Sequence, residues 1–308
     1  MSVTWEGVFP AVTTKFNDAL EIDAHWTEVN LEAQIAAGAA GIVVSGSLGE
    51  ASTLSMEEKA ELVELTVRLV KGRVPTICGI AQRTTADACT MCKMAEAAGA
   101  QGLMLLPPML YTSDRRETIT FLRTVAAATD LPIMLYNNPV AYNVDLTPEM
   151  LQELADEPKF EAVKESSDDV RRITDIVNLV GDRYAIFTGV DNVALEALML
   201  GAVGWIAGLV DAFPRETVAI YNLARQGRYA EALKIYRWFM PLLHLDVNIK
   251  LVQNIKLAES MVGLGTETVR PPRLPLAGEE RTRVIATINE ALANRPEELV
   301  SQALGQPC

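Results

Sequence analysis

The chain has 308 residues, of which 49% are hydrophobic and 22% are charged, and its formal net charge at pH 7 is -13. This balance indicates one large globular domain or two ordinary ones, and it excludes collagen-like chains, long disordered tails and small disulfide-stabilised folds. The acidic charge argues against nucleic acid or an anionic membrane as a partner, because contacts with phosphates need clustered Lys and Arg side chains.

Short apolar runs alternate along the chain with longer stretches in which apolar residues recur every three or four positions. The short runs predict strands at 7–12, 40–45, 74–80, 102–107, 132–137, 161–165, 184–189 and 203–208. The longer stretches predict helices at 23–37, 55–71, 84–98, 114–127, 147–155, 168–180 and 191–200. Strands that are apolar throughout and joined by helices are typical of a parallel sheet covered on both faces.

Two closures of this sheet compete, an open doubly wound sheet and a (β/α)8 barrel. The eighth predicted strand ends at residue 208, in units of about 25 to 35 residues, which favours the barrel. The nucleotide-binding alternatives lack their main signals. No G-x-G-x-x-G follows the first strand, and the turn SGSLGE at 45–50 has no Walker lysine.

Helical patterns continue beyond the eighth strand, at 214–226, 228–243, 248–262 and 278–293. One segment among them, VRPPRLPL at 269–276, is held extended by its prolines. We therefore predict a barrel that carries the active site at 1–225, and a helical extension packed on it at 226–308.

The sequence shows no signal for a membrane or for secretion. Its apolar runs are broken by Gly, Ser or Pro within ten residues, whereas a transmembrane helix needs ~20 apolar residues. The N-terminal segment has no basic stretch ahead of an apolar core, and four cysteines are too few and too irregular for a disulfide framework. We expect a cytoplasmic protein.

Lys164 is the most informative polar residue, because active sites of barrels lie at the carboxyl ends of the strands. Of nine lysines, it is the one inside a predicted strand, where burial lowers the pKa of an amine and leaves it free to attack a ketone. The alternative is a lysine that reaches solvent or pairs with Glu165 or Asp168.

Tyr136 ends the strand before that of Lys164, close enough for its phenol to relay protons to a substrate held there, although it could equally be a core aromatic. The turn Gly46-Ser47-Leu48-Gly49 offers backbone N–H groups and one hydroxyl, which suit a carboxylate, but the same residues could form a plain turn. We interpret Glu50 as a structural carboxylate.

Metal chemistry has little support in the sequence. Cys89 and Cys92 lie in the middle of a predicted helix without a second pair, and His25 and His244 lie away from strand ends. We therefore expect neither a metal nor a cofactor, and activation through a lysine imine.

The motifs taken together resemble the dihydrodipicolinate synthase and N-acetylneuraminate lyase superfamily, whose members are (β/α)8 Schiff-base lyases with a C-terminal helical extension. The likeness runs from Gly7 to about Asn294. It is carried by G-S-L-G-E-A-S-T-L-S at 46–55, Y-N-N-P at 136–139, V-K-E-S-S at 163–167 and T-G-V-D at 188–191.

The resemblance implies a role for each matched position. Lys164 would form the Schiff base, Tyr136 would relay protons, and Ser47 would supply the hydroxyl next to it. The turn at Gly46, with the amides of Ser47 and Leu48, would hold the carboxylate of a 2-oxo acid. Gly189 and Ile206 would shape the imine pocket. It also implies a homotetramer of paired dimers.

Three departures from the family pattern stand out. The second threonine of the family's turn is Leu48 here. The synthase's paired tyrosines correspond to Pro108 and Met109, so a tyrosine lent by a neighbouring subunit has no counterpart unless Tyr111 replaces it. The synthase's arginine after Y-N-x-P is replaced by Ala141 or Tyr142, and neither residue offers the paired hydrogen bonds of a guanidinium.

The missing arginine weighs against aspartate semialdehyde as a substrate. We predict a lyase acting on a 2-oxo acid or its cyclic imine, with Tyr142 near the distal part of the substrate. The resemblance points to the hydroxyproline-degradation branch, specifically to the deaminase of 1-pyrroline-4-hydroxy-2-carboxylate. The alternatives are a pyruvate-dependent aldolase, 4-hydroxy-tetrahydrodipicolinate synthase and, more remotely, a non-catalytic binding barrel.

Overall fold

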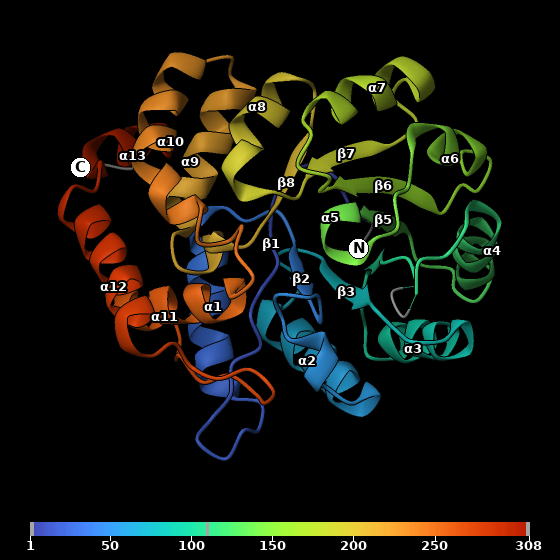
Figure 1. Cartoon of the computed structure of the whole chain (residues 1–308), viewed down its shortest axis with the longest axis horizontal. Coiled ribbons are helices and arrows are strands. Elements are labelled where there is room, and N and C mark those ends of the chain that lie inside the picture. The colour runs from blue at the N-terminus through green and yellow to red at the C-terminus, as the bar shows by residue number, and fades with distance from the viewer. Residues whose placement is uncertain (1–2, 109–110, 306–308) are drawn as a thin grey trace.

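A computed structural model describes residues 3–108 and 111–305 of the chain. Its strands are β1 (Gly7–Pro10), β2 (Ile42–Val44), β3 (Thr76–Ile80), β4 (Gly102–Leu105), β5 (Ile133–Asn137), β6 (Phe160–Glu165), β7 (Ala185–Thr188) and β8 (Gly204–Ala207). They pair in parallel in the order β1-β8-β7-β6-β5-β4-β3-β2. A parallel bridge between Ala11 and Val43 joins the two ends of this sheet. The predicted (β/α)8 barrel is confirmed (Figure 1).

Helices follow the strands around the outside of the barrel. They are α1 (Ala24–Ala37), α2 (Met56–Val70), α3 (Thr85–Ala97), α4 (Arg115–Ala126), α6 (Pro148–Glu153), α7 (Arg171–Val180), α8 (Ala194–Met199) and α9 (Pro214–Arg225). Their beginnings follow the capping signals of the sequence. In α2, for example, the Ser55 side chain accepts from the Glu58 amide while the Glu58 carboxylate accepts from the Ser55 amide.

The short helix that follows β5 was not predicted. The segment α5 (Pro139–Tyr142) follows β5 directly, with Pro139 in its first turn and the Asn138 side chain accepting a hydrogen bond from the Ala141 amide. Its four residues are too few for a helical period to show in the sequence. This turn sets the position of Tyr142.

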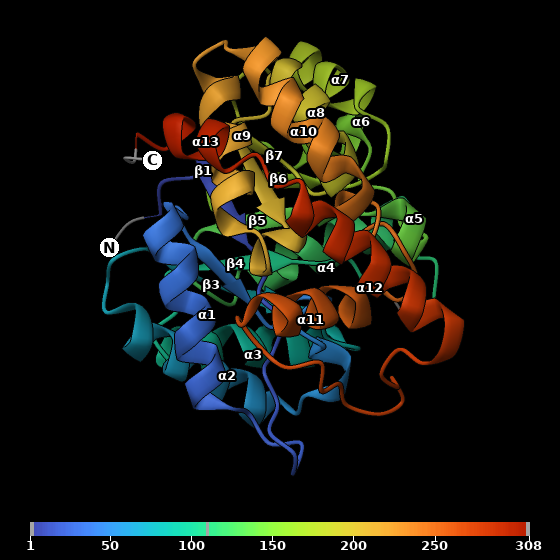
Figure 2. The same cartoon turned by 90° about the vertical axis from the view of Figure 1, so that its left-hand side faces the viewer.

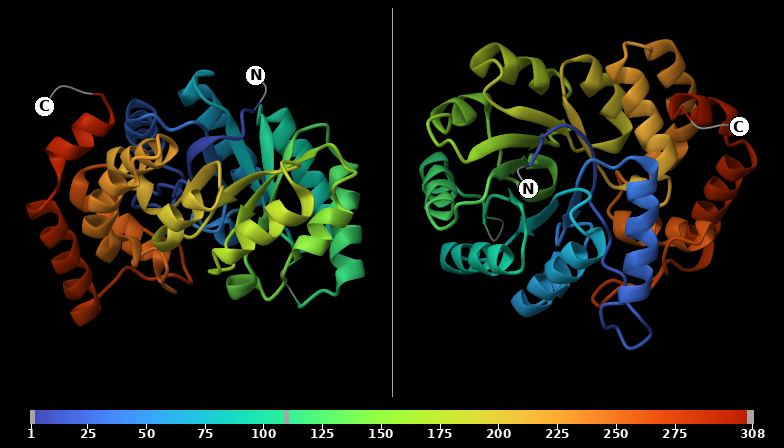
Figure 3. Two further views of the ribbon diagram at one scale, coloured as in Figure 1. Left: turned by 90° about the horizontal axis from the view of Figure 1, so that it is seen from above. Right: turned by 180° about the vertical axis from the view of Figure 1, so that it is seen from behind.

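The chain continues past the barrel in α10 (Tyr229–Leu243), α11 (Leu251–Val262), α12 (Gly278–Ala293) and α13 (Glu297–Ala303), the last of which was not predicted. Figure 2 shows α10, α11 and α12 together, in orange and red, and the left panel of Figure 3 shows them beside the barrel. One hydrophobic cluster includes Phe9 of β1 and Leu242 of α10. The division at residue 225 stays a prediction.

Aromatic rings fill the interior of the barrel. The ring centroids of Phe9 on β1 and Phe187 on β7 are 5.2 Å apart, and that of Trp5, which precedes β1, is 6.0 Å from that of Phe9. Because β8 separates β1 from β7 in the sheet, these rings meet inside the barrel. The interior is therefore a packed core, and polar side chains gather at the carboxyl ends of the strands.

Candidate active site

A cavity of about 390 Å³ opens at the carboxyl ends of the strands. Its walls come from the turn after β2, from β5 with α5, from the ends of β6, β7 and β8, and from the segment 246–251, which runs from after α10 to the first residue of α11. All the residues singled out in the sequence line it, namely Lys164, Tyr136, Ser47, Gly46, Leu48, Gly189, Ile206 and Tyr142. The structure thus brings these residues together, while their roles stay predictions.

Lys164 projects from β6 and is buried, with 6% of its surface exposed. Its Nζ atom lies 4.0 Å from the centroid of the Tyr136 ring, and the two residues are partners in register on β5 and β6. Burial lowers the pKa of Lys164, although the nearby Tyr142, Asp246 and Asp191 raise it in part. The amine is therefore held toward its uncharged form.

The alternative interpretation of Lys164 required a partner in Glu165 or Asp168. Glu165 instead accepts hydrogen bonds from the Asn137 side chain at 3.0 Å and from the Ser167 amide at 2.6 Å. Within the described part of the chain neither carboxylate forms an ion pair with Lys164. The lysine also does not reach solvent, since it is buried.

Burial alone does not distinguish Lys164. Lys15, Lys59 and Lys256 are also buried, but the first has an ion pair with Glu259 at 2.8 Å and the last with Glu50 at 2.5 Å. Lys59 donates to the Gln82 side chain at 2.9 Å. Lys164 differs from these three because it lines the cavity and has no oxygen partner among the described residues. Its place inside a strand was the signal that identified it.

Three hydroxyl groups line one side of the cavity. The Ser47 hydroxyl is hydrogen-bonded to the Tyr142 hydroxyl, and the rings of Tyr136 and Tyr142 stand perpendicular with centroids 5.8 Å apart. Burial raises the pKa of the Tyr136 phenol, while hydrogen bonds with Asn138 and Tyr142 lower it. Tyr142 therefore lies between Ser47 and Tyr136, where the sequence predicted direct neighbours. Its position on the unpredicted α5 explains the difference.

The turn after β2 presents its backbone to the same cavity. The Glu50 amide donates to the Ser47 carbonyl and the Ala51 amide to the Gly46 carbonyl, both at 3.2 Å. The amides of Ser47 and Leu48 donate no hydrogen bond to any described residue. Two free N–H groups beside a hydroxyl are suitable donors for a carboxylate.

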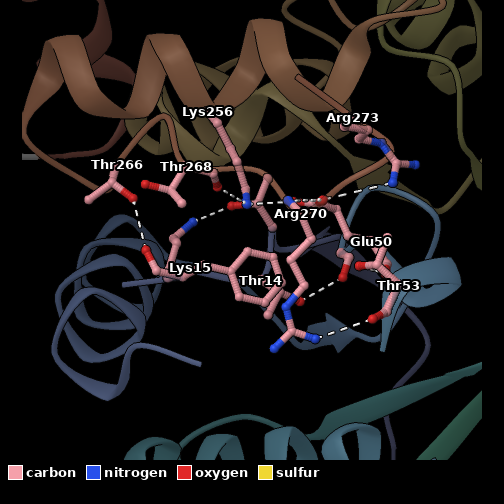
Figure 4. Close-up of polar contacts among 12 residues, drawn as sticks. Thr14, Lys15, Glu50, Thr53, Lys256, Thr266, Thr268, Arg270 and Arg273 are labelled. Carbon is pink, nitrogen blue, oxygen red and sulfur yellow. Dashed lines mark hydrogen bonds and ion pairs between the residues drawn. The ribbon is translucent and has the colours of Figure 1, made fainter. Parts of the chain in front are cut away.

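Glu50 anchors this turn to the C-terminal extension. Its buried carboxylate pairs with Lys256 of α11 at 2.5 Å and accepts from the Arg270 amide at 3.1 Å. Lys256 also donates to the Thr268 carbonyl at 2.7 Å. Figure 4 shows these contacts, in which the barrel meets α11 and the segment that follows it. Glu50 is thus a paired structural carboxylate, as predicted.

The sequence reasoning missed the contribution of segment 246–251. The helix predicted at 248–262 begins only at Leu251, so Asp246, Val247, Asn248 and Ile249 precede it and line the cavity. Asp246 is half-buried there, whereas Ile249 is 95% exposed. A charged residue placed between two helical patterns was the available signal, but only the packing of the extension turns it toward Lys164.

Other residues raised by the sequence lie elsewhere. Tyr111, the possible substitute for the lent tyrosine, is 57% exposed and lies outside this cavity, and Met109 falls outside the described residues. Asp191 accepts from the Trp205 indole at 2.9 Å and from the Leu209 amide at 2.8 Å, so it holds the end of β8.

Among residues 3–108 and 111–305, no group of three or more His, Cys, Asp or Glu side chains is placed to hold a metal ion. In the same part of the chain, no helix has both the length and the apolar character needed to cross a bilayer.

Comparison with known proteins extends this picture. The model of the dihydrodipicolinate synthetase family matches residues 4–291. A 4-hydroxy-tetrahydrodipicolinate synthase of Methanospirillum hungatei is 33% identical over 283 residues, which are 90% of this chain and 96% of that protein. An uncharacterized DapA-like lyase of Rhizobium meliloti is 31% identical over 273 residues, 88% of this chain and 91% of the relative.

Solved structures agree with the sequence comparisons. The 4-hydroxy-tetrahydrodipicolinate synthase of Methylacidiphilum fumariolicum superposes with a TM-score of 0.89 at 30% identity, covering 97% of this chain and 99% of its own. A dihydrodipicolinate synthase of Acinetobacter baumannii, solved in complex with pyruvate, gives a TM-score of 0.90 at 27% identity, covering 94% and 99%. The chain belongs to the dihydrodipicolinate synthetase family of lyases.

Proposed function

We propose that the protein is a Schiff-base lyase in which the Lys164 amine condenses with C2 of a 2-oxo acid or its cyclic imine. The observation that carries the proposal is the unpaired amine of Lys164, buried in the cavity with its Nζ atom 4.0 Å from the centroid of the Tyr136 ring. A buried amine of lowered pKa is a nucleophile near neutral pH, and its imine withdraws electrons from the neighbouring carbon.

The other predicted residues fit the steps that an imine requires. The free amides of Ser47 and Leu48 would hold the substrate carboxylate, and Gly189 and Ile206 would shape the pocket around the imine. The hydroxyls of Tyr136, Tyr142 and Ser47 would carry protons to and from the substrate, since adjacent hydrogen-bonded hydroxyls can pass a proton along. No cofactor beyond the lysine is needed for this chemistry.

As the specific substrate we propose 1-pyrroline-4-hydroxy-2-carboxylate. Its support is the lining of the cavity, which includes no arginine among the described residues. Ala141 or Tyr142 stands where the resemblance places the synthase's arginine. A second substrate carboxylate would meet no guanidinium there, which disfavours aspartate semialdehyde.

The reaction consumes one water overall, because it releases one water and uses two in hydrolysis. Lys164 replaces the ring nitrogen at C2 and opens the ring, loss of a C3 proton gives an enamine, and the C4–O bond breaks to release water. The double bond then moves to the bond between C5 and its nitrogen. Hydrolysis at C5 releases ammonia, and hydrolysis at C2 releases 2-oxoglutarate semialdehyde and restores the lysine.

4-Hydroxy-tetrahydrodipicolinate synthase is the second candidate, favoured by the names of the relatives in Methanospirillum hungatei and Methylacidiphilum fumariolicum. A pyruvate-dependent aldolase would use the same lysine, and the similar Acinetobacter baumannii synthase was solved in complex with pyruvate. The family resemblance also leads us to propose a cytoplasmic homotetramer, which sedimentation velocity would test.

One experiment separates these candidates. The protein is incubated with pyruvate or with 1-pyrroline-4-hydroxy-2-carboxylate and borohydride, then weighed and mapped, while ammonia release is followed in parallel without reductant. We expect an adduct on Lys164 with both compounds and ammonia from the pyrroline. An adduct without ammonia would point to the synthase or aldolase, and the absence of any adduct would point to a binding barrel.

A further inference from the structure

Asp246 is a second chemical group in the cavity, contributed by the C-terminal extension. It lies after α10, three residues beyond the end of that helix at Leu243, and lines the cavity together with Lys164 of β6. Its amide donates to the Leu243 carbonyl at 3.1 Å, and the Asn254 side chain of α11 donates to the Leu245 carbonyl at 3.0 Å. The segment that carries this carboxyl group is therefore hydrogen-bonded both to the end of α10 and to α11.

The barrel makes room for this carboxyl group at Gly208. A Cβ atom built on Gly208 would lie 2.2 Å from Oδ1 of Asp246, closer than real Cβ contacts come. The φ of Gly208 is −102°, a value that any residue adopts, so its backbone conformation does not require glycine. A side chain at the end of β8 would instead displace the Asp246 carboxyl group from its place.

The Asp246 carboxyl group has no hydrogen-bonding partner among the described residues, in contrast to the other carboxylates around the cavity. Asp191 accepts from Trp205, Gly208 and Leu209, and Glu50 is paired with Lys256. Carboxylates that serve structure are bonded in this way. A carboxyl group held against the barrel but left unbonded beside the cavity is available to a ligand.

The groups around Asp246 set its protonation. Burial raises the pKa of its carboxyl group well above the usual range, the charge of Asp191 raises it further, and Lys164 lowers it. Tyr136 of β5 also interacts electrostatically with Asp246, and Asp168 lines the same cavity. With one cationic residue and two acidic ones around it, the carboxyl group carries a proton to higher pH than an ordinary aspartate.

We propose that Asp246 is a catalytic acid that donates its proton to the group leaving the distal part of the substrate, opposite the imine on Lys164. The proposal rests on the proposed function. In the deaminase reaction, the enamine electrons form the C3–C4 double bond as the C4–O bond breaks, and the Asp246 proton converts the departing hydroxyl to water. The carboxylate is then reprotonated by the proton released from C5.

The test compares Asp246→Asn and Asp246→Glu with Asp182→Asn, a matched change in an exposed turn that does not line the cavity. Three quantities are measured: the borohydride adduct with pyruvate, kcat for ammonia release from 1-pyrroline-4-hydroxy-2-carboxylate, and the pH profile of kcat. The adduct reports on folding and on Lys164 independently of any acid at the distal end.

We expect Asp246→Asn to form the adduct as the unchanged protein does but to lose about 10²–10⁴-fold in kcat, the usual contribution of a positioned acid. Because the acid must be protonated, kcat should fall on the alkaline side of the profile, and this fall should vanish in Asp246→Asn and persist in Asp246→Glu. Asp182→Asn should keep both the kcat and the profile.

The two proposals fail in different ways. If the unchanged protein releases no ammonia, the substrate assignment fails and the role of Asp246 in this reaction fails with it. If it releases ammonia and Asp246→Asn does so within about threefold, with the same alkaline fall, Asp246 is not the acid and the proposed function stands. Loss of the adduct in both Asp246 variants would instead make Asp246 a residue that positions Lys164, which also overturns the proposal.

Discussion

The Nζ atom of Lys164 lies 4.0 Å from the centroid of the Tyr136 ring, and the two residues are partners in register on neighbouring strands. This arrangement excludes water from one side of the amine and faces it with the electron-rich surface of an aromatic ring. Both side chains come from strands and not from loops, so their separation is set by the sheet. A preorganised pair of this kind is what proton transfer around an imine requires.

Removal of either member of this pair should stop or nearly stop turnover. We expect Lys164→Ala to form no borohydride adduct and to show no turnover, because no other described amine lines the cavity. Tyr136→Phe should keep the adduct but lose about 10²–10⁴-fold in kcat. Mass spectrometry of the trapped protein and steady-state kinetics check both expectations. Lys93→Ala, at an exposed position of α3, is the control, and ordinary activity in Lys164→Ala would remove the mechanism.

The hydrogen bond between Ser47 and Tyr142 should make these residues act as one unit. We expect Ser47→Ala and Tyr142→Phe each to lower kcat by about tenfold or more, and the double variant to lose little beyond the larger single loss. A double-mutant cycle on kcat measures this coupling. Losses that simply multiply would show that the two hydroxyls serve separate steps, and Tyr142 would then contact only the distal part of the substrate.

Lys164 should lower the stability of the fold at neutral pH. Burial lowers its pKa in the folded state, so between that value and about 10.5 the unfolded chain binds a proton that the folded chain does not. Stability therefore falls as pH is lowered through this window. We expect Lys164→Met to unfold at a higher temperature near pH 7, because its free energy of unfolding should rise by about 0.5–2 kcal/mol. This gain should shrink as the pH approaches about 10. Calorimetry at both pH values checks this, and an equal gain at both would mean that packing and not charge is responsible.

Breaking the ion pair between Lys256 and Glu50 should be costly because both side chains are fully buried. Lys256→Met leaves the buried Glu50 carboxylate with the Arg273 guanidinium, 3.8 Å away, as its remaining cation, and the expected cost is about 3–5 kcal/mol of unfolding free energy. Lys250→Met breaks the pair of Lys250 with Glu280, which is more than a third exposed, and should cost about 0–1 kcal/mol. Urea denaturation of the two variants makes the comparison, and similar losses would show that the buried pair is not a main support of the turn after β2.

The sequence by itself determined the barrel and the identity of its central lysine. Apolar strands and helical periods are local signals, and each strand predicted between residues 7 and 208 forms within one residue of the predicted range. Lys164 stood out because a lysine is unusual within such a strand. The turn at 46–49 and the Y-N-N-P motif were recognisable for the same reason, since their chemistry is written in consecutive residues.

Only the tertiary structure decided what surrounds that lysine. Tyr142 comes between Ser47 and Tyr136 because α5, a single turn, follows β5. Asp246 faces the cavity because α10 packs against α8 and α9, and α11 packs against the turn Leu209–Asp211 that follows β8. The hydrogen bond between Ser47 and Tyr142, for example, joins residues 95 positions apart. No local pattern encodes such contacts, because they depend on the closure of the barrel and on the side against which the extension packs.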